Sequence, residues 1–228
     1  MVQIEGDCMN LIMVSPTYGP VDPSAARALR IAVMNAAGNG HRWVSDVSTN
    51  RQSWTVARNT AVKETLKEHG DDPEAYMVWM DSDVIPPPYA ITNLLAYGKD
   101  FVTGIYFQRT GKHWPVLANY KKDTDSFQWM AKWPKNIIAP IDGCGFGCCV
   151  TSIKMLKDIE PLWFEYKRFS EDFDFCLKAK KAGYQLYVDT GILCGHLKEP
   201  EPATIDDFIK TNPKIFETNP DGDTSSVA

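Results

Sequence analysis

The stretch Tyr76-Met-Val-Trp-Met-Asp-Ser-Asp83 decides the fold, because it joins an apolar run to two acidic residues. A short run that is apolar at every position is typical of a central strand buried on both faces of a parallel sheet. Ligands of open α/β sheets bind beyond the carboxyl ends of such strands. The stretch therefore predicts a central strand over 76–80 and places Asp81 and Asp83 at the edge of a site.

Short apolar runs and helical patterns alternate on both sides of this stretch. Asp22 and Pro23 suit the N-cap and the first position of a helix, which Gly38 and Gly40 end. The predicted strands cover 10–15, 41–46, 76–80, 101–107, 148–152 and 184–188, and the later predicted helices cover 55–69, a short segment ending at 95, 153–159 and 171–182. This alternation predicts an α/β fold with a Rossmann-like, mostly parallel central sheet flanked by helices. Residues 110–135 have no helical period and predict a small β-rich insert.

Composition and charge argue against several classes of protein. The 228 residues carry 24 Lys and Arg against 29 Asp and Glu, a net charge of −5, so binding to nucleic-acid backbones is not expected. No apolar run approaches the roughly 20 residues that span a bilayer, so no membrane span is expected. The start, from Met1 to Asp7, does not resemble a signal peptide, and a cytoplasmic location is expected.

Six cysteines lie at 8, 144, 148, 149, 176 and 194, and none forms a C-x-x-C pair. In a chain without an export signal, the simplest interpretation is reduced thiols in apolar surroundings. A zinc site at Cys144 and Cys148 is the minor alternative, because structural zinc usually takes closer, paired spacing.

Asp81 and Asp83 are one residue apart, so in an extended segment both carboxylates point to the same side. Two hard oxygen donors on one side suit Mg²⁺ or Mn²⁺, especially a cation that also binds phosphate. The competing interpretation is a solvated turn in which an aspartate caps the next helix. An isolated D-x-D favours that turn, so the rest of the sequence has to decide.

A second group of acids follows Ser170, which is a suitable helix N-cap. Glu171 and Asp172 in the first turn would interact favourably with the helix dipole, which is a structural role. The functional interpretation is that one of them faces a cleft and acts as a general base toward a hydroxyl group.

Other polar residues fall at predicted strand ends or on a helix. His196 follows a late strand and is either a structural residue or a ligand of a divalent metal. Arg58 either forms a surface salt bridge or neutralises a diphosphate. Thr17, Tyr18 and Asp46 lie at neighbouring predicted strand ends, where an Asp or Thr side chain can contact a nucleobase edge.

Taken in order, these motifs resemble the succession in nucleotide-sugar glycosyltransferases of the GT-A fold, in the family-2-like branch of bacteria and phages. The motifs are Pro16-Thr-Tyr18, Ala57-Arg-Asn59, Trp79-Met-Asp-Ser-Asp83, Asp142-Gly-Cys-Gly-Phe-Gly147, Glu171-Asp172 with Phe175, and Gly195-His196. The resemblance runs from about residue 10 to residue 197. D-x-D alone is common, whereas the ordered set is much more specific.

The resemblance implies one GT-A domain over 1–197, with a nucleotide-binding half at about 8–109 and an acceptor and catalytic half at 110–197. It implies Mn²⁺ or Mg²⁺ as cofactor, with Asp83 as direct ligand, Asp81 on ribose or on the metal through water, and His196 completing the site. The residues implied to bind the nucleotide sugar are Pro16, Thr17, Tyr18, Asp46, Arg58, Asp81, Ser82, Gly143, Cys144 and Gly145. The glycines would let the backbone come close to the donor sugar.

The implied reaction moves a sugar from a UDP- or GDP-sugar to a saccharide or another hydroxyl acceptor. Asp172, or Glu171 as second choice, would deprotonate the acceptor for in-line attack and inversion, although some relatives with the late histidine are retaining. Without a Q-x-x-R-W motif or membrane helices, a single addition is favoured over polymer synthesis. If a phage encodes the protein, the host cytoplasm is its expected location.

Two further segments have open interpretations. Trp114, Trp129 and Trp133 either stack on acceptor sugars or pack the insert onto the sheet. The partly mobile tail at 198–228, with one helical turn near 206–210, is either a lid ordered by the donor or a plain end.

Two other functions compete with the glycosyltransferase. A sugar-phosphate nucleotidyltransferase normally has a basic, glycine-rich loop after its first strand, and Ser15-Pro-Thr-Tyr-Gly-Pro20 contains no Lys or Arg. A non-catalytic carbohydrate-binding protein on the same fold would bind sugar without turnover and without needing a metal.

Overall fold

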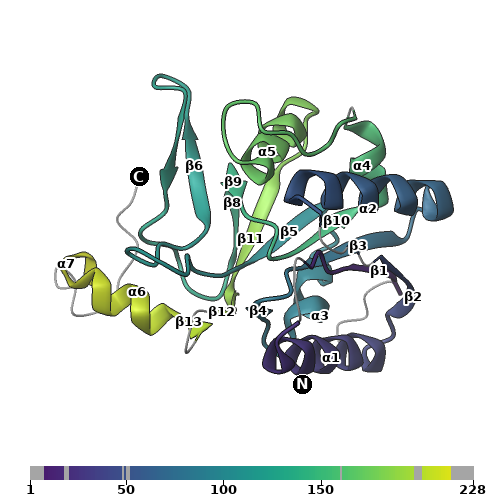
Figure 1. Ribbon diagram of the computed structural model, residues 1–228, viewed down its shortest axis with the longest axis horizontal. Coiled ribbons are helices and arrows are strands. Elements are labelled where there is room, and N and C mark those ends of the chain that lie inside the picture. Colours follow the sequence, from purple (N-terminus) through teal and green to yellow (C-terminus); the bar gives the residue numbers. More distant parts are fainter. Residues whose placement is uncertain are drawn as a thin grey trace.

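A seven-stranded sheet forms the centre of the molecule, in the order β2-β1-β3-β10-β5-β11-β8 (Figure 1). The computed structural model describes residues 8–17, 21–47, 49, 52–159, 161–197 and 202–216. The strands of this sheet are β1 (Asn10–Val14), β2 (Arg42–Val47), β3 (Ala75–Met80), β5 (Phe101–Ile105), β8 (Ile138–Ile141), β10 (Cys148–Ser152) and β11 (Leu186–Leu193). The neighbours β2, β1 and β3 are parallel, as are β5 and β11, whereas β10 and β8 run antiparallel to their neighbours. The predicted mostly parallel α/β sheet is confirmed.

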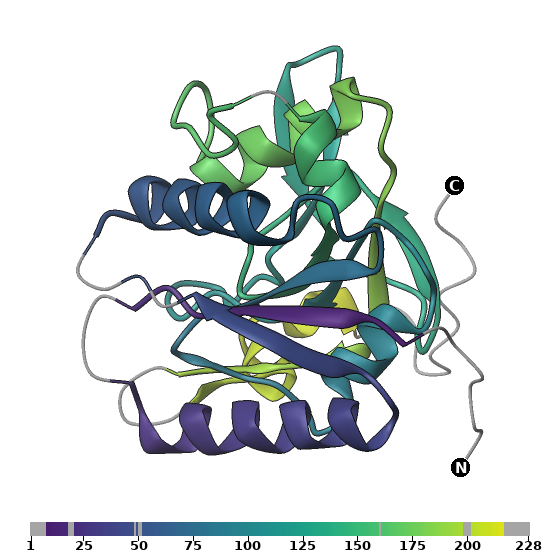
Figure 2. The same cartoon turned by 90° about the vertical axis from the view of Figure 1, so that its right-hand side faces the viewer.

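Helices cover both faces of this sheet (Figures 1 and 2). One face carries α2 (Trp54–His69), α4 (Ile153–Asp158) and α5 (Glu171–Lys181), and the other carries α1 (Pro23–Gly38) and α3 (Ala90–Leu95). Successive residues of β3 point into alternate cores, with Trp79 on the side of α2 and Met80 on the side of α1. Burial on both faces explains why β3 is apolar at every position.

Local sequence signals set the ends of α1, as predicted. The Oδ1 atom of Asp22 accepts a hydrogen bond from the backbone N–H of Ser24 at 2.7 Å, and Pro23 begins the helix. Beyond the last turn, Gly40 adopts a φ of 93°, a conformation that disfavours other residues.

Two small sheets adjoin the central one. In the first, β6 (Leu117–Lys121) pairs with β7 (Ser126–Trp129) and with β9 (Gly143–Cys144), which confirms the β-rich insert. The second joins β4 (Val84–Ile85), β12 (Gly195–Leu197) and β13 (Pro202–Ala203), and the sequence did not predict it. Because His196 of β12 pairs with Val84 of β4, the histidine comes next to Asp83.

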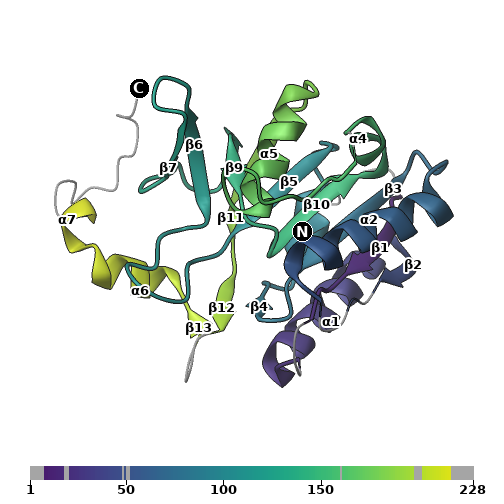
Figure 3. The ribbon, with the colours of Figure 1, turned by 45° about the horizontal axis from the view of Figure 1, so that its top comes forward.

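The end of the described chain packs onto the insert (Figure 3). α6 (Ile205–Thr211) precedes α7 (Pro213–Phe216), and Phe208 is fully buried. The ring of Phe208 lies 6.0 Å from Trp133 and 5.6 Å from Trp114, so both tryptophans serve packing rather than a sugar platform. Phe208 of α6 is thus part of the core, and the prediction that the tail acts as a lid stays a prediction, since residues 198–201 and 217–228 lie outside the described ranges. Among the described helices, none has the length and apolar character needed to cross a bilayer.

Candidate functional site

The predicted nucleotide-contacting residues lie along one edge of the sheet. Val14 of β1 pairs in parallel with Val47 of β2 and with Trp79 of β3, so the three strands end side by side. Pro16 and Thr17 follow β1, and the backbone N–H of Thr17 donates to the carbonyl of Thr49 at 2.9 Å. Asp46 is exposed near the end of β2, as expected for this edge. Tyr18 lies outside the described residues.

The acidic motif forms a turn. The backbone N–H of Val84 donates to the carbonyl of Asp81 at 3.1 Å, which closes a turn that includes Ser82. The prediction of an extended segment is therefore wrong. The turn directs Asp81 toward Arg58 and Asp83 toward His196, and only 13% and 29% of the two side chains are exposed.

Arg58 on α2 lies beneath this turn with 3% of its surface exposed, so the surface salt-bridge interpretation is wrong. Its Nη1 atom donates to Glu171 Oε1 at 2.6 Å, and its Nη2 atom lies 3.3 Å from Asp81 Oδ1. Burial acts to lower the pKa of Arg58, but the carboxylates of Asp81, Asp172 and Glu171 outweigh it and raise the pKa. Arg58 thus holds β3 and α5 together, and it is engaged with protein groups rather than open to a diphosphate.

The two aspartates of the turn have opposite pKa shifts. Burial raises the pKa of Asp81 to about 6, against the lowering effect of Arg58, and the charge of Asp83 adds to the rise. Burial also acts to raise the pKa of Asp83, but the hydrogen bond with His196 and the charges of His196 and Arg109 outweigh it and lower the pKa overall. The turn therefore combines one carboxylate that resists ionisation with one that favours it.

His196 presents one ring nitrogen to the site. Its Nδ1 atom lies 2.7 Å from the carbonyl of Phe107, an acceptor, so Nδ1 carries the proton. Its Nε2 atom then faces Asp83 Oδ2 at 3.4 Å. A histidine held by a carbonyl at Nδ1 is the usual arrangement of a metal-binding imidazole. Within the described parts of the chain, however, no three His, Cys, Asp or Glu side chains form a group that could hold a metal ion.

The helix α5 carries the two candidate bases, and their surroundings differ. Glu171 is 5% exposed and bound to Arg58, so the second-choice base is engaged in a buried ion pair. Asp172 accepts hydrogen bonds at Oδ1 from the Ser170 hydroxyl and from the backbone N–H of Phe173. Burial raises the pKa of Asp172, with the charge of Glu171 adding to the rise against Arg58. Among the described residues, nothing is hydrogen-bonded to its Oδ2 atom.

The glycine-rich turn is filled by the protein itself. A Cβ atom on Gly143 would meet the rings of Phe127 and Phe173, and one on Gly145 would collide with the hydroxyl of Tyr106. The prediction that these glycines leave room for a ligand beside the backbone is therefore wrong, because aromatic rings cover the side on which a Cβ atom would lie. Cys144, between them, is a buried free thiol, and the described residues give no support to the zinc alternative.

Two buried residues that the sequence analysis did not single out organise the site. Tyr106 accepts a hydrogen bond from Gly147 N–H at 3.3 Å, and its ring meets His196 edge-on at 5.3 Å. Asp174 Oδ2 accepts the backbone N–H groups of 167, 168 and 169 at 2.8, 3.0 and 3.2 Å, and so shapes the loop before α5. A lone tyrosine after a strand and an acid within a helix have no sequence signal for these roles.

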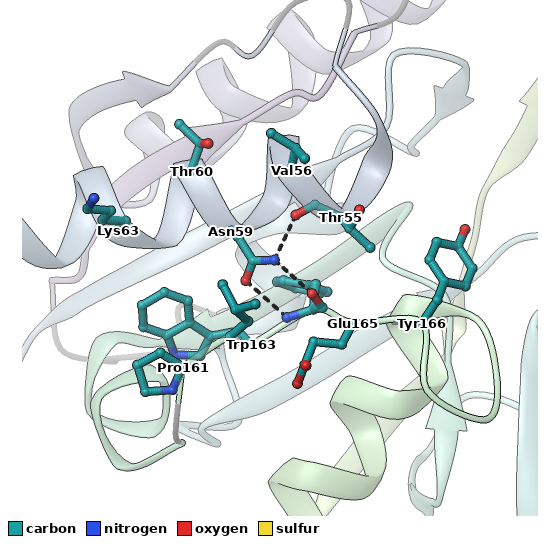
Figure 4. A pocket seen from close by; sticks show the side chains of 11 residues that line it. Thr55, Val56, Asn59, Thr60, Lys63, Pro161, Trp163, Glu165 and Tyr166 are labelled. Atoms are coloured by element: carbon teal, nitrogen blue, oxygen red, sulfur yellow. Dashed lines mark hydrogen bonds between the residues drawn. The ribbon is translucent and has the colours of Figure 1, made fainter.

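An apolar groove of about 770 Å³ lies between α2 and the loop before α5 (Figure 4). Asn59 fixes its floor, since its side chain exchanges hydrogen bonds with the backbone of Phe164 at 2.7 and 3.1 Å. Val56 and Leu162 are 51% and 56% exposed along it. Burial raises the pKa of Tyr166 to about 12 and the nearby Glu171 adds to the rise, so one end of the groove adjoins the carboxylates.

Comparison with solved structures identifies the fold. A197 from STIV matches with a TM-score of 0.60 and 20% identity over 87% of this chain and 92% of that one. GalNAc-T7, solved with UDP, GalNAc and Mn²⁺, matches with a TM-score of 0.53 and 10% identity over 92% of this chain, which spans 48% of GalNAc-T7. No protein-family model and no curated protein sequence matches the chain. The protein therefore has the GT-A fold, as the motifs implied.

Proposed function

We propose that this protein is a glycosyltransferase that moves a sugar from a nucleoside-diphosphate sugar to a hydroxyl acceptor with the help of a divalent cation. The observation that carries the proposal is the meeting of Asp83, His196 and the Arg58-bound Asp81 at the carboxyl edge of a GT-A sheet. GalNAc-T7, a structural neighbour, was solved with a nucleotide, a sugar and Mn²⁺, which supports the same class of ligands here.

Two side chains at this edge suit a divalent cation whose remaining ligands would come from the donor diphosphate and water. Asp83 would supply a carboxylate and His196, with Nε2 deprotonated, would supply a nitrogen, a donor set that suits Mn²⁺ and, through its oxygen, Mg²⁺. Asp81 is turned toward Arg58, so its predicted contact is through water or with ribose. A bound cation would neutralise the charge of the leaving diphosphate.

Asp172 is the proposed general base. Its raised pKa moves it toward the working range of a base, and its Oδ2 atom is available to a hydroxyl proton. As the acceptor oxygen bonds to the anomeric carbon, the bond from that carbon to the diphosphate breaks, and Asp172 takes the acceptor proton. Attack in line with the leaving group inverts the anomeric centre. Glu171 instead orients Arg58.

The donor is proposed to lie along the edge formed by Pro16, Thr17, Asp46 and Asp81, with Tyr18 completing it. UDP- and GDP-sugars are the proposed donors, and a saccharide or another hydroxyl compound is the acceptor, with one sugar added per reaction. Because aromatic rings cover Gly143 and Gly145, we expect side chains rather than the glycine backbone to contact the donor sugar.

Calorimetry with UDP and GDP, each with and without MnCl₂, tests the binding half of the proposal. We expect nucleotide binding that strengthens with Mn²⁺, and loss of this gain in Asp83→Ala. Asp158→Ala removes an exposed aspartate outside the site and serves as the matched control. Nucleotide binding that ignores Mn²⁺ and survives Asp83→Ala would overturn the proposal.

Mass spectrometry of reactions with a panel of nucleotide sugars and acceptors tests turnover. Asp172→Asn should keep nucleotide binding and lower turnover by about 10²- to 10⁴-fold, the usual contribution of a general base. Unchanged turnover would remove Asp172 from this role. Release of pyrophosphate from a nucleoside triphosphate and a sugar phosphate would instead identify a nucleotidyltransferase, and sugar binding without any turnover would identify a non-catalytic protein.

A further inference from the structure

Arg109 already occupies the carboxylate that the proposed cation needs. Its Nη1 atom lies 3.0 Å from Asp83 Oδ2, the same oxygen that His196 Nε2 faces at 3.4 Å. The Arg109 side chain is 54% exposed, in contrast to the buried Arg58. The guanidinium therefore sits on the open side of the site, as a positive charge on the oxygen proposed to bind a metal.

The backbone that carries Arg109 is held in place. Gln108 N–H donates to the carbonyl of Trp114 at 2.9 Å, which closes the loop between them. From α6, the Asn212 side chain donates to the carbonyl of Lys112 at 2.8 Å, and the Thr211 hydroxyl donates to the same oxygen at 3.0 Å. A fixed loop with an exposed arginine allows the guanidinium to move by side-chain rotation alone.

A guanidinium and a divalent cation cannot share Asp83 Oδ2 at contact distance, because two positive charges that close repel each other strongly. Binding of a cation at this oxygen would therefore displace Arg109. An exposed ion pair is weak, so the displacement costs little. Once released, the planar guanidinium can donate paired hydrogen bonds to phosphate oxygens, for which its geometry is well suited.

We propose that Arg109 is a diphosphate-binding residue that takes the place of the cation on Asp83 when no donor is bound. This inference rests on the proposed function. A bound nucleotide would draw Arg109 away from Asp83 and so favour cation binding, and a bound cation would release Arg109 toward the phosphates. Because such coupling is reciprocal, each ligand raises the affinity for the other by the same factor.

The test measures Mn²⁺ binding by electron paramagnetic resonance, with and without UDP, and UDP binding by calorimetry. In Arg109→Ala, Mn²⁺ alone should bind up to about fivefold more tightly, since an exposed competing ion pair has been removed. UDP should bind about tenfold more weakly, since a charged hydrogen bond has been lost. The factor by which UDP strengthens Mn²⁺ binding should fall.

Two further variants separate charge from geometry and position. Arg109→Lys keeps the charge but not the paired donors, so it should keep the weak Mn²⁺ binding of the unmodified protein and lose part of the UDP affinity. Lys154→Ala removes an exposed cation that also pairs with an aspartate at 3.0 Å, and it should change neither affinity. High salt should shrink the effect of Arg109→Ala on Mn²⁺ binding.

Mn²⁺ affinity that is unchanged or weaker in Arg109→Ala would overturn the competition, and unchanged UDP affinity would overturn the role in diphosphate binding. These failures differ from failure of the proposed function. If the unmodified protein binds neither Mn²⁺ nor a nucleotide, the glycosyltransferase proposal fails first. If it binds both and Arg109→Ala behaves like Lys154→Ala, only the inference about Arg109 fails.

Discussion

The two sides of the acidic turn are built differently. On the inner side, Arg58 joins Asp81 to Glu171, and the arginine is 3% exposed. On the outer side, Arg109 and His196 face Asp83, and the arginine is 54% exposed. Two arginine–aspartate contacts of similar length, 3.3 and 3.0 Å, thus have different roles. The inner contact stabilises the fold, and the outer contact is free to be exchanged for ligands.

The largest loss of stability should come from removing Arg58, on the inner side of the turn. Arg58→Ala leaves Asp81 and Glu171 buried without their cation, and breaking a buried ion pair costs about 3–5 kcal/mol. We expect a loss of this size in the free energy of unfolding, measured by urea denaturation. Arg58→Lys should recover only part of it, because one ammonium cannot reproduce the two-sided contact. A loss below about 1 kcal/mol would show that the two sides do not differ.

A smaller loss of stability is expected from a substitution in the glycine-rich turn, where Gly145 lies against Tyr106. Gly145→Ala places a methyl group against the Tyr106 hydroxyl, and overpacking of this kind costs about 1–3 kcal/mol. Since Tyr106 packs on His196, Mn²⁺ binding should weaken as well. Gly38→Ala is the control, because no atom lies within 4 Å of the added carbon. Equal unfolding temperatures for the two variants would argue against a tight fit at Tyr106.

The pH dependence of stability should distinguish the two aspartates. The pKa of Asp81 is raised to about 6, so its ionisation destabilises the folded state, and its contribution should fall as pH rises from about 4 to 6. The pKa of Asp83 is lowered, so its contribution is present above its unfolded pKa and is lost as pH falls through the folded one. We expect the Asp81 effect to be on the order of 1–2 kcal/mol.

Urea denaturation of Asp81→Asn and Asp83→Asn across this pH range measures both contributions. Relative to the unmodified protein, Asp81→Asn should become relatively more stable as pH rises, and Asp83→Asn relatively less stable. Parallel pH profiles for the two variants would contradict the opposite shifts.

The smallest effect on stability belongs to the outer arginine. Arg109→Ala should change the free energy of unfolding by less than about 1 kcal/mol, since exposed ion pairs contribute little. Thermal unfolding without ligands checks this. A loss comparable with that of Arg58→Ala would make Arg109 a structural residue and would remove the contrast.

The sequence predicted the parts of the fold that local patterns determine. The apolar run at 76–80, the Asp22–Pro23 start of α1 and the β-rich insert at 110–135 each have a short-range signal, and each appears in the structure. The pairing of β12 with β4 has no such signal, because it depends on contact between segments far apart in the chain. That pairing is what moves His196 next to Asp83.

For the candidate site, the sequence indicates which residues take part better than it indicates which residues they contact. Asp81, Asp83 and His196 were singled out and lie together, but the turn that separates the two carboxylates was not foreseen. The sequence does not predict the burial of Arg58, because burial of an arginine depends on carboxylates from other elements. Arg109 was missed for a related reason, since a single basic residue after a strand does not indicate which acid it will contact.

The register of the β4–β12 pairing determines where His196 lies relative to Asp83. Side chains alternate along a strand, so a slip of one residue would turn the imidazole of His196 away from Asp83. The carboxylates belong to the early part of the chain and the imidazole to a late one. During synthesis, a nascent chain that has emerged only through α5 contains the two aspartates and Arg58, but it does not yet contain His196. The proposed ligand site is therefore completed late in synthesis, after most strands of the central sheet have been made.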